Sequence, residues 1–112
     1  MRVMMISRAC LVGAYQSKLE AIASHPDIEL TVVVPAFWRE GSRVVRLEQV
    51  YTAGYQLVVA PVIWNGSFHL HYFPTASSLL ADVRPDLLHM DEEPYNVATY
   101  HALRAARRAG VR

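Results

Sequence analysis

The chain has 112 residues, of which 53% are hydrophobic and 19% are charged, which is the composition of a folded globular protein. This length fits one domain with a core of its own. A net charge of +1 gives no reason to expect nucleic acid as a partner. A single cysteine, Cys10, excludes an internal disulfide and favours a reducing compartment, so we expect a cytoplasmic protein.

The first 34 residues predict a strand, a helix and a second strand. Val3 to Ile6 is a continuous apolar run, as in a strand that is covered on both faces. Apolar residues then recur at helical spacing at Tyr15, Leu19, Ile22 and Ala23. Ile28 to Val34 is β-branched and apolar, which predicts the second strand. This βαβ pattern indicates an α/β fold with a parallel sheet.

Residues 35 to 73 predict a mainly β section. Residues 35 to 42 contain proline, glycine and two aromatic residues and are interpreted as a loop. Strands are predicted over 44 to 50 and 56 to 63. Asn65-Gly66 then separates the second of these from a strand-like run at 68 to 73, which predicts a hairpin.

The remaining residues return to the alternating pattern. A helix is predicted over 76 to 83, ended by Arg84-Pro85, and a buried strand follows at 87 to 90. An alanine-rich helix is predicted from Pro94 to Arg108, with Gly110 as its C-terminal cap. Val111 is typical of the first residue of another strand, so we expect the chain to be the N-terminal part of a longer protein.

An acidic loop follows the last predicted strand. Asp91, Glu92, Glu93 and Asn96 would lie beyond the carboxyl end of a parallel strand, where open α/β sheets bind ligands. The same residues at a helix start also complement the helix dipole, so a ligand site and a solvated cap are both open. His89 precedes the acids and is expected at the rim of the sheet.

Other candidate residues give weaker signals. Trp38 and Arg39 lie on the predicted 35–42 loop and suit a sugar or an anion, although a tryptophan packed over the sheet edge fits equally well. His69 and His71 share a strand face, but without a third ligand a metal site is not expected. The loop from Ser7 to Gly13 lacks both the dinucleotide fingerprint and the P-loop pattern, although its glycine permits a phosphate to approach the backbone.

The chain resembles the N-terminal domain of a glycosyltransferase of family 4 (group 1) with the GT-B fold. The likeness extends over residues 1–112 and rests on MRVMMIS with its glycine-bearing loop, VVVPAFWREG, FHLHYFP and above all RPDLLHMDEEPYNVAT. It implies a Rossmann-like three-layer sandwich, mostly parallel, with a hairpin section. It also implies retaining transfer of a sugar from a nucleotide-sugar donor to a sugar or lipid-linked acceptor, in a cleft closed by a C-terminal donor domain that this chain lacks.

The resemblance assigns roles to individual residues. Arg8 and Gly13 are expected near the donor, since Gly13 matches the loop glycine beside the donor phosphates. The loop with Asp91, Glu92 and Glu93 matches the one that reaches the transferred sugar and is expected to be catalytic. The acceptor side would comprise Trp38, Arg39, His89 and Asn96. Many members read H-x-H-E-P where this chain reads H-M-D-E-E-P, so Glu92 is expected to replace the usual histidine.

The resemblance also sets the expected ligands and the alternatives. No metal or cofactor other than the nucleotide-sugar co-substrate is expected, and peripheral contact with a membrane is expected only of the full-length enzyme. A stand-alone flavodoxin-like binding module stays open as a second interpretation. A receiver domain is disfavoured because Ser7-Arg8-Ala9 supplies no acid for Mg²⁺ after the first strand. A glycoside hydrolase would need two opposed carboxylates, and the chain offers one cluster.

Overall fold

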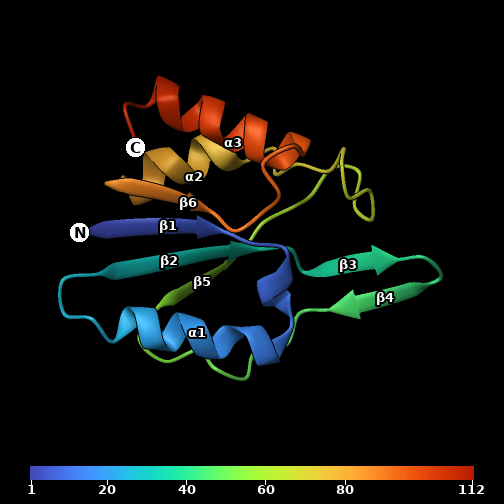
Figure 1. Ribbon diagram of the computed structural model, residues 1–112, viewed down its shortest axis with the longest axis horizontal. Coiled ribbons are helices and arrows are strands. Elements are labelled where there is room, and N and C mark those ends of the chain that lie inside the picture. The colour runs from blue at the N-terminus through green and yellow to red at the C-terminus, as the bar shows by residue number, and fades with distance from the viewer.

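A computed structural model describes all 112 residues as a Rossmann-like three-layer α/β sandwich (Figure 1). Its central sheet has four parallel strands in the order β5-β2-β1-β6. The strands are β1 (Arg2–Ile6), β2 (Glu29–Val34), β5 (Gln56–Val59) and β6 (Leu87–Met90). The predicted fold class, a mostly parallel α/β sandwich with an additional hairpin, is confirmed.

Helices cover both faces of this sheet, as Figure 1 shows. Helix α1 (Gly13–Ala23) packs on one face, where Leu19 joins a core cluster with Val3 and Met5. Helices α2 (Ala76–Val83) and α3 (Val97–Arg108) cover the other face, where the core contains Met4 and Ile6. Successive residues of a strand point to opposite faces, and here both faces are covered. This explains why β1 is apolar from Val3 to Ile6.

The hairpin lies elsewhere than predicted. Strands β3 (Phe37–Glu40) and β4 (Arg43–Arg46) pair antiparallel, so residues 35 to 42 are not a loop and the predicted 44–50 strand ends at residue 46. Gly41 turns this hairpin with a φ of 62°, a conformation that glycine adopts without strain.

The predicted Asn65-Gly66 hairpin is wrong. Strand β5 ends at residue 59, and residues 68 to 73 form turns with a single bridge between Ile63 and Tyr72. The side chain of Asn65 accepts a hydrogen bond from Arg39 N and donates one to Phe37 O, both at 2.8 Å. Asn65 therefore fastens the 61–73 segment onto β3 instead of turning a hairpin of its own.

Helix α3 starts later than predicted and ends as predicted. It begins at Val97, because the side chain of Asn96 caps it by accepting a hydrogen bond from Thr99 N at 2.9 Å. At the other end Gly110 has a φ of 73° and donates to Arg107 O, and Val111 N donates to Ala106 O. These two bonds form a Schellman motif, which confirms the predicted glycine cap.

The strand order creates a topological switch point between β1 and β6. The chain leaves β1 through α1 on one face of the sheet and enters β6 from α2 on the other face (Figure 1). Open α/β sheets bind ligands in the crevice that such a divergence opens at the carboxyl ends of the strands. Two loops meet there, residues 7–12 after β1 and residues 91–96 after β6. None of the helices is long and apolar enough to cross a membrane.

Candidate functional site

Ionisable side chains gather where the loops after β1 and β6 meet. A cleft of about 340 Å³ lies there, and its lining residues are Arg8, Ala9, Tyr15, Lys18, Met90, Asp91, Glu92 and Glu93. Strand register creates this arrangement, since Ile6 pairs with Met90 and the next residues on each strand meet directly. A larger hollow of about 530 Å³ runs along α3, but it is lined by arginines and contains no carboxylate or histidine. The cleft between β1 and β6 is therefore the candidate site.

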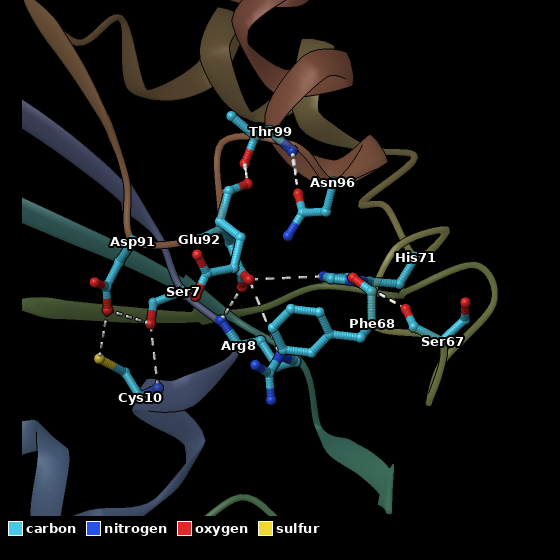
Figure 2. Close-up of polar contacts among 11 residues, drawn as sticks. Ser7, Arg8, Cys10, Ser67, Phe68, His71, Asp91, Glu92, Asn96 and Thr99 are labelled. Atoms are coloured by element: carbon cyan, nitrogen blue, oxygen red, sulfur yellow. Dashed lines mark hydrogen bonds and ion pairs between the residues drawn. The ribbon is translucent and has the colours of Figure 1, made fainter.

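Asp91 turns toward the α1 side of the crevice (Figure 2). Its Oδ2 accepts a hydrogen bond from Ser7 Oγ at 2.8 Å and one from Lys18 Nζ at 3.1 Å. Burial by itself would raise the pKa of this carboxyl, but the bonds from Ser7 and Lys18 outweigh it and leave the pKa below its usual value. Asp91 is therefore ionised at neutral pH. Cys10 lies beside it, and burial raises the pKa of the Cys10 thiol, so this cysteine is not a reactive thiolate.

Glu92 turns the other way, into the protein. Its side chain is 3% exposed, and its Oε1 accepts a hydrogen bond from Arg8 N at 2.6 Å. Burial raises the pKa of Glu92 above its usual value, although the Arg8 amide and guanidinium act in the opposite direction. Adjacent carboxyl groups with pKa values shifted in opposite directions are an arrangement that acid–base chemistry uses.

His71 faces Glu92 from the 67–73 segment and is fully buried (Figure 2). Its Nε2 lies 3.8 Å from Glu92 Oε2, and its Nδ1 lies 2.9 Å from Ser67 O and 3.1 Å from Phe68 O. Burial lowers the pKa of His71, and the positive charge of Arg8 lowers it further, against the effect of the two carbonyl groups. The ring is therefore neutral at neutral pH.

Arg8 is held by aromatic rings. Its guanidinium carbon lies 4.7 Å from the centroid of the Trp38 ring and 4.9 Å from that of Phe68, which is the geometry of a cation–π contact. Trp38 is 5% exposed and its ring meets His71 edge-on at 4.8 Å. Trp38 is therefore packed against the protein, as in the second of the two interpretations of this residue, and its ring contacts both Arg8 and His71.

Gly13 has a packing role in this structure. Its N–H donates to Glu48 Oε1 at 3.0 Å, and a Cβ at this position would lie 2.6 Å from Val50 Cγ2. The buried side chain of Gln16 holds the same segment, because its Oε1 accepts from Val50 N and its Nε2 donates to Glu48 O. The 48–50 segment therefore covers the amide that the donor phosphates were expected to approach.

The other predicted residues divide between the crevice and more distant positions. Glu93 is exposed and lines the cleft, while Asn96 is buried beside Glu92 as the cap of α3, and its Nδ2 has no hydrogen-bond partner. Arg39 is exposed on β3 with its guanidinium over Phe37, and His89 is exposed on β6. The structure thus brings Arg8, Trp38, Asp91, Glu92, Glu93 and Asn96 together and leaves Gly13, Arg39 and His89 outside.

Sequence reasoning missed Ser7, Lys18, Phe68 and His71 as parts of the site. The sequence predicts that His71 shares a strand face with His69, whereas the structure buries His71 and leaves His69 exposed against Tyr95. Lys18 lies in the second turn of α1, and the helical spacing of apolar residues there gives no reason to single out this lysine. No three histidine, cysteine or acidic side chains come together in an arrangement that holds a metal ion.

The arrangement suits binding and proton exchange with a polar ligand. One wall of the crevice carries the ionised Asp91 with Lys18, and the other carries Arg8 and Glu92, with the fully buried His71 behind Glu92. Comparisons with protein-family models, curated proteins and solved structures gave no match to this chain.

Proposed function

We propose that the chain is the N-terminal, acceptor-side domain of a retaining glycosyltransferase that moves a sugar from a nucleotide-sugar donor to an acceptor. The observation that carries the proposal is the meeting of Arg8, Asp91 and Glu92 at the switch point between β1 and β6. Ligands of open α/β sheets bind at this place. The resemblance of RPDLLHMDEEPYNVAT to the family supplies the class of ligand.

The residues of the crevice suit the parts of such a ligand. Arginine pairs well with phosphate, so Arg8 is assigned to the diphosphate of the donor. The ionised Asp91 and the exposed Glu93 accept hydrogen bonds from sugar hydroxyls. Trp38 does not contact the ligand but holds Arg8 in place, and Asn96 likewise holds the start of α3.

Binding tests the proposal directly. The amide spectrum of the ¹⁵N-labelled protein would be recorded with a panel of uridine, guanosine and adenosine diphosphate sugars. We expect at least one of them to shift the amides of residues 7–10 and 91–93, and Glu93→Gln to weaken that response by about tenfold, the effect of one charged hydrogen bond. Asp82→Asn is the matched control, because Asp82 is an exposed acid that lines a hollow with Arg2 and Glu29, at the amino ends of the strands and away from the crevice. Shifts that avoid both loops with every ligand, or an equal loss in the control, would refute the assignment.

Transfer itself is expected to need a second wall. Stabilising a departing diphosphate requires groups on both sides of the reacting bond, and this domain supplies one side. We therefore expect a polypeptide of residues 1–112 to bind nucleotide sugar without transferring the sugar. Turnover by this polypeptide alone would contradict that expectation. Its partners would be the acceptor and its own C-terminal domain.

A stand-alone binding module is the second candidate. The observation that favours it is that contacts within the chain already join the two loops of the crevice, with Arg8 N bonded to Glu92 and Lys18 to Asp91. Such a module would bind a small polar ligand in the same crevice with no preference for a nucleotide. Free sugars and free nucleotides in the same panel separate the two candidates, since only the transferase domain is expected to prefer the joined molecule.

A further inference from the structure

The position of the proton on His71 follows from its neighbours. Carbonyl oxygens only accept hydrogen bonds, and Nδ1 lies within hydrogen-bond distance of two of them, Ser67 O and Phe68 O. Nδ1 must therefore carry a hydrogen. In a neutral ring the other nitrogen, Nε2, is then a bare acceptor.

That bare nitrogen faces a second acceptor. Nε2 lies 3.8 Å from Glu92 Oε2 and has no other hydrogen-bond partner in the chain. Both side chains are buried, His71 fully and Glu92 to all but 3%, so solvent screens their repulsion poorly. Two acceptors in this position are unfavourable unless a proton lies between them. The geometry therefore calls for one proton on the pair.

We propose that Glu92 carries this proton at neutral pH and that His71 is the positioning residue toward which it points. The inference concerns the crevice of the proposed function and rests on that proposal only for the identity of the ligand. It agrees with the effect of burial, which raises the pKa of Glu92 and lowers that of His71.

Two neighbouring segments bring charges to the pair. Arg8, from the loop after β1, is the cation nearest Glu92, with Nε at 3.9 Å from its Oε2, and it disfavours a charged His71. Asp91, from the same loop as Glu92, raises the pKa of Glu92, and its own charge is paired with Lys18 of α1.

Uncharged residues complete the surroundings of the pair. Trp38 of β3 and Asn96 at the start of α3 carry no charge, although the Asn96 side-chain amide lowers the pKa of Glu92 and so opposes the larger effect of burial. The backbone of Ser67 and Phe68 presents carbonyl groups to the ring of His71. No neighbouring element therefore supplies a second positive charge that would keep Glu92 ionised.

Protonation of Glu92 sets the charge that a ligand meets. The lining of the cleft contains Arg8 and Lys18 as cations and Asp91 and Glu93 as anions, so the sum is zero when Glu92 is neutral and negative when it is ionised. An anionic ligand such as a nucleoside diphosphate sugar therefore favours the protonated form. Its affinity is expected to fall as the pH rises through the pKa of Glu92, by up to about tenfold for each pH unit.

Nuclear magnetic resonance tests the inference without any ligand. The side-chain carboxyl carbon of Glu92 and the ring nitrogens of His71 would be followed from pH 5 to pH 9, and assigned by their loss in Glu92→Gln and His71→Asn respectively. We expect Glu92 to be protonated at pH 7 and His71 to keep its hydrogen on Nδ1 with Nε2 bare. The Glu92→Gln variant replaces the acid with an amide that donates from the same position, so it should leave the His71 signals unchanged.

Each outcome decides the question. A Glu92 carboxyl that is ionised at pH 7 overturns the inference, whether His71 is neutral or charged, and so does a His71 ring with its hydrogen on Nε2. If His71→Asn does not fold, the wild-type and Glu92→Gln spectra suffice, because the buried ring is recognised by its contact with Trp38. A protonated Glu92 in a protein that binds no nucleotide sugar would support this inference and refute the proposed function, so the two fail separately.

Discussion

Replacing Gly13 by alanine separates a packing role for this glycine from a ligand role. The new Cβ would lie 2.6 Å from Val50 Cγ2 and 3.1 Å from Val50 Cβ, and unlinked carbon atoms do not approach so closely. The 48–50 segment must therefore move outward. This movement weakens the bond from Gly13 N to Glu48 and the two bonds that Gln16 makes to the segment.

The expected loss is about 1–2 kcal/mol. Inserting a methyl group into a filled space costs about 1–3 kcal/mol. Alanine in place of glycine returns up to about 1 kcal/mol through helix propensity, and less than this at the first helical residue. For a domain of this size the net loss corresponds to a decrease in melting temperature of about 4–8 °C. Val50 is itself 59% exposed, so Val50→Ala should cost well under about 1 kcal/mol.

Denaturant unfolding of the wild type, the two single variants and the double variant completes the cycle. We expect Gly13→Ala/Val50→Ala to recover most of the lost stability, which gives a coupling energy of about 1 kcal/mol between the two positions. A Gly13→Ala variant as stable as the wild type, or a double variant that recovers nothing, would refute the packing explanation. If the double variant also binds nucleotide sugar as the wild type does, the glycine is not needed for a phosphate.

Three further predictions concern single positions. Glu92 has a folded pKa above its ordinary 4.5, so it stabilises the fold at low pH and this contribution is lost as the pH rises through the folded pKa. Glu92→Gln should therefore gain stability relative to the wild type as the pH rises from 4.5 to the folded pKa, by about 1.4 kcal/mol for each pH unit between the two. A difference in chemical unfolding that does not change with pH would contradict this. Asn96→Ala should lose about 1 kcal/mol by removing the cap of α3, and Asn96→Ser should restore most of it; equal losses in both would show that the amide acts otherwise. Gly66→Ala should lose about 1–3 kcal/mol, because φ is 95° and the Cβ would lie 3.0 Å from Arg39 O, whereas Gly110→Ala, with no atom near its Cβ, should cost only the strain of its positive φ; similar melting temperatures would contradict the contact.

The elements that sequence predicted well are those with a strong local signal. Strands β1 and β2 each contain a run of buried apolar residues, Val3 to Ile6 and Val32 to Val34, so neighbouring residues alone identify them. Helix α2 follows the helical period, and so does α1, although Tyr15 of its predicted apolar face is exposed. The hairpin was misplaced because Asn65-Gly66 is the stronger turn signal by composition. The side chain of Asn65 instead bonds to β3, a contact between residues 26 and 28 positions apart that no local pattern contains.

The candidate site was predicted only in part for a similar reason. Asp91, Glu92 and Glu93 are adjacent in the chain, and the rule for parallel strands places them at the sheet edge. The residues that bond these acids come from distant parts of the chain. Ser7 lies 84 residues from Asp91, Arg8 lies 84 residues from Glu92, and Lys18 lies 73 residues from Asp91. Which side chain meets which acid depends on the register of β1 against β6, and sequence periodicity fixes the face of a strand without fixing its neighbour.

The opposite directions of Asp91 and Glu92 explain how one loop provides two chemical environments. Successive residues at the end of an extended strand point to opposite sides, so Asp91 reaches the α1 face with Ser7 and Lys18, and Glu92 reaches toward His71 (Figure 2). The first environment is polar and stabilises an anion, while the second is buried and favours the neutral acid. A capping role for the acids is not needed to hold α3, because Asn96 already caps it. The acids are instead held by Ser7, Lys18 and the Arg8 amide, so the two environments belong to the crevice between β1 and β6 and not to the cap of α3.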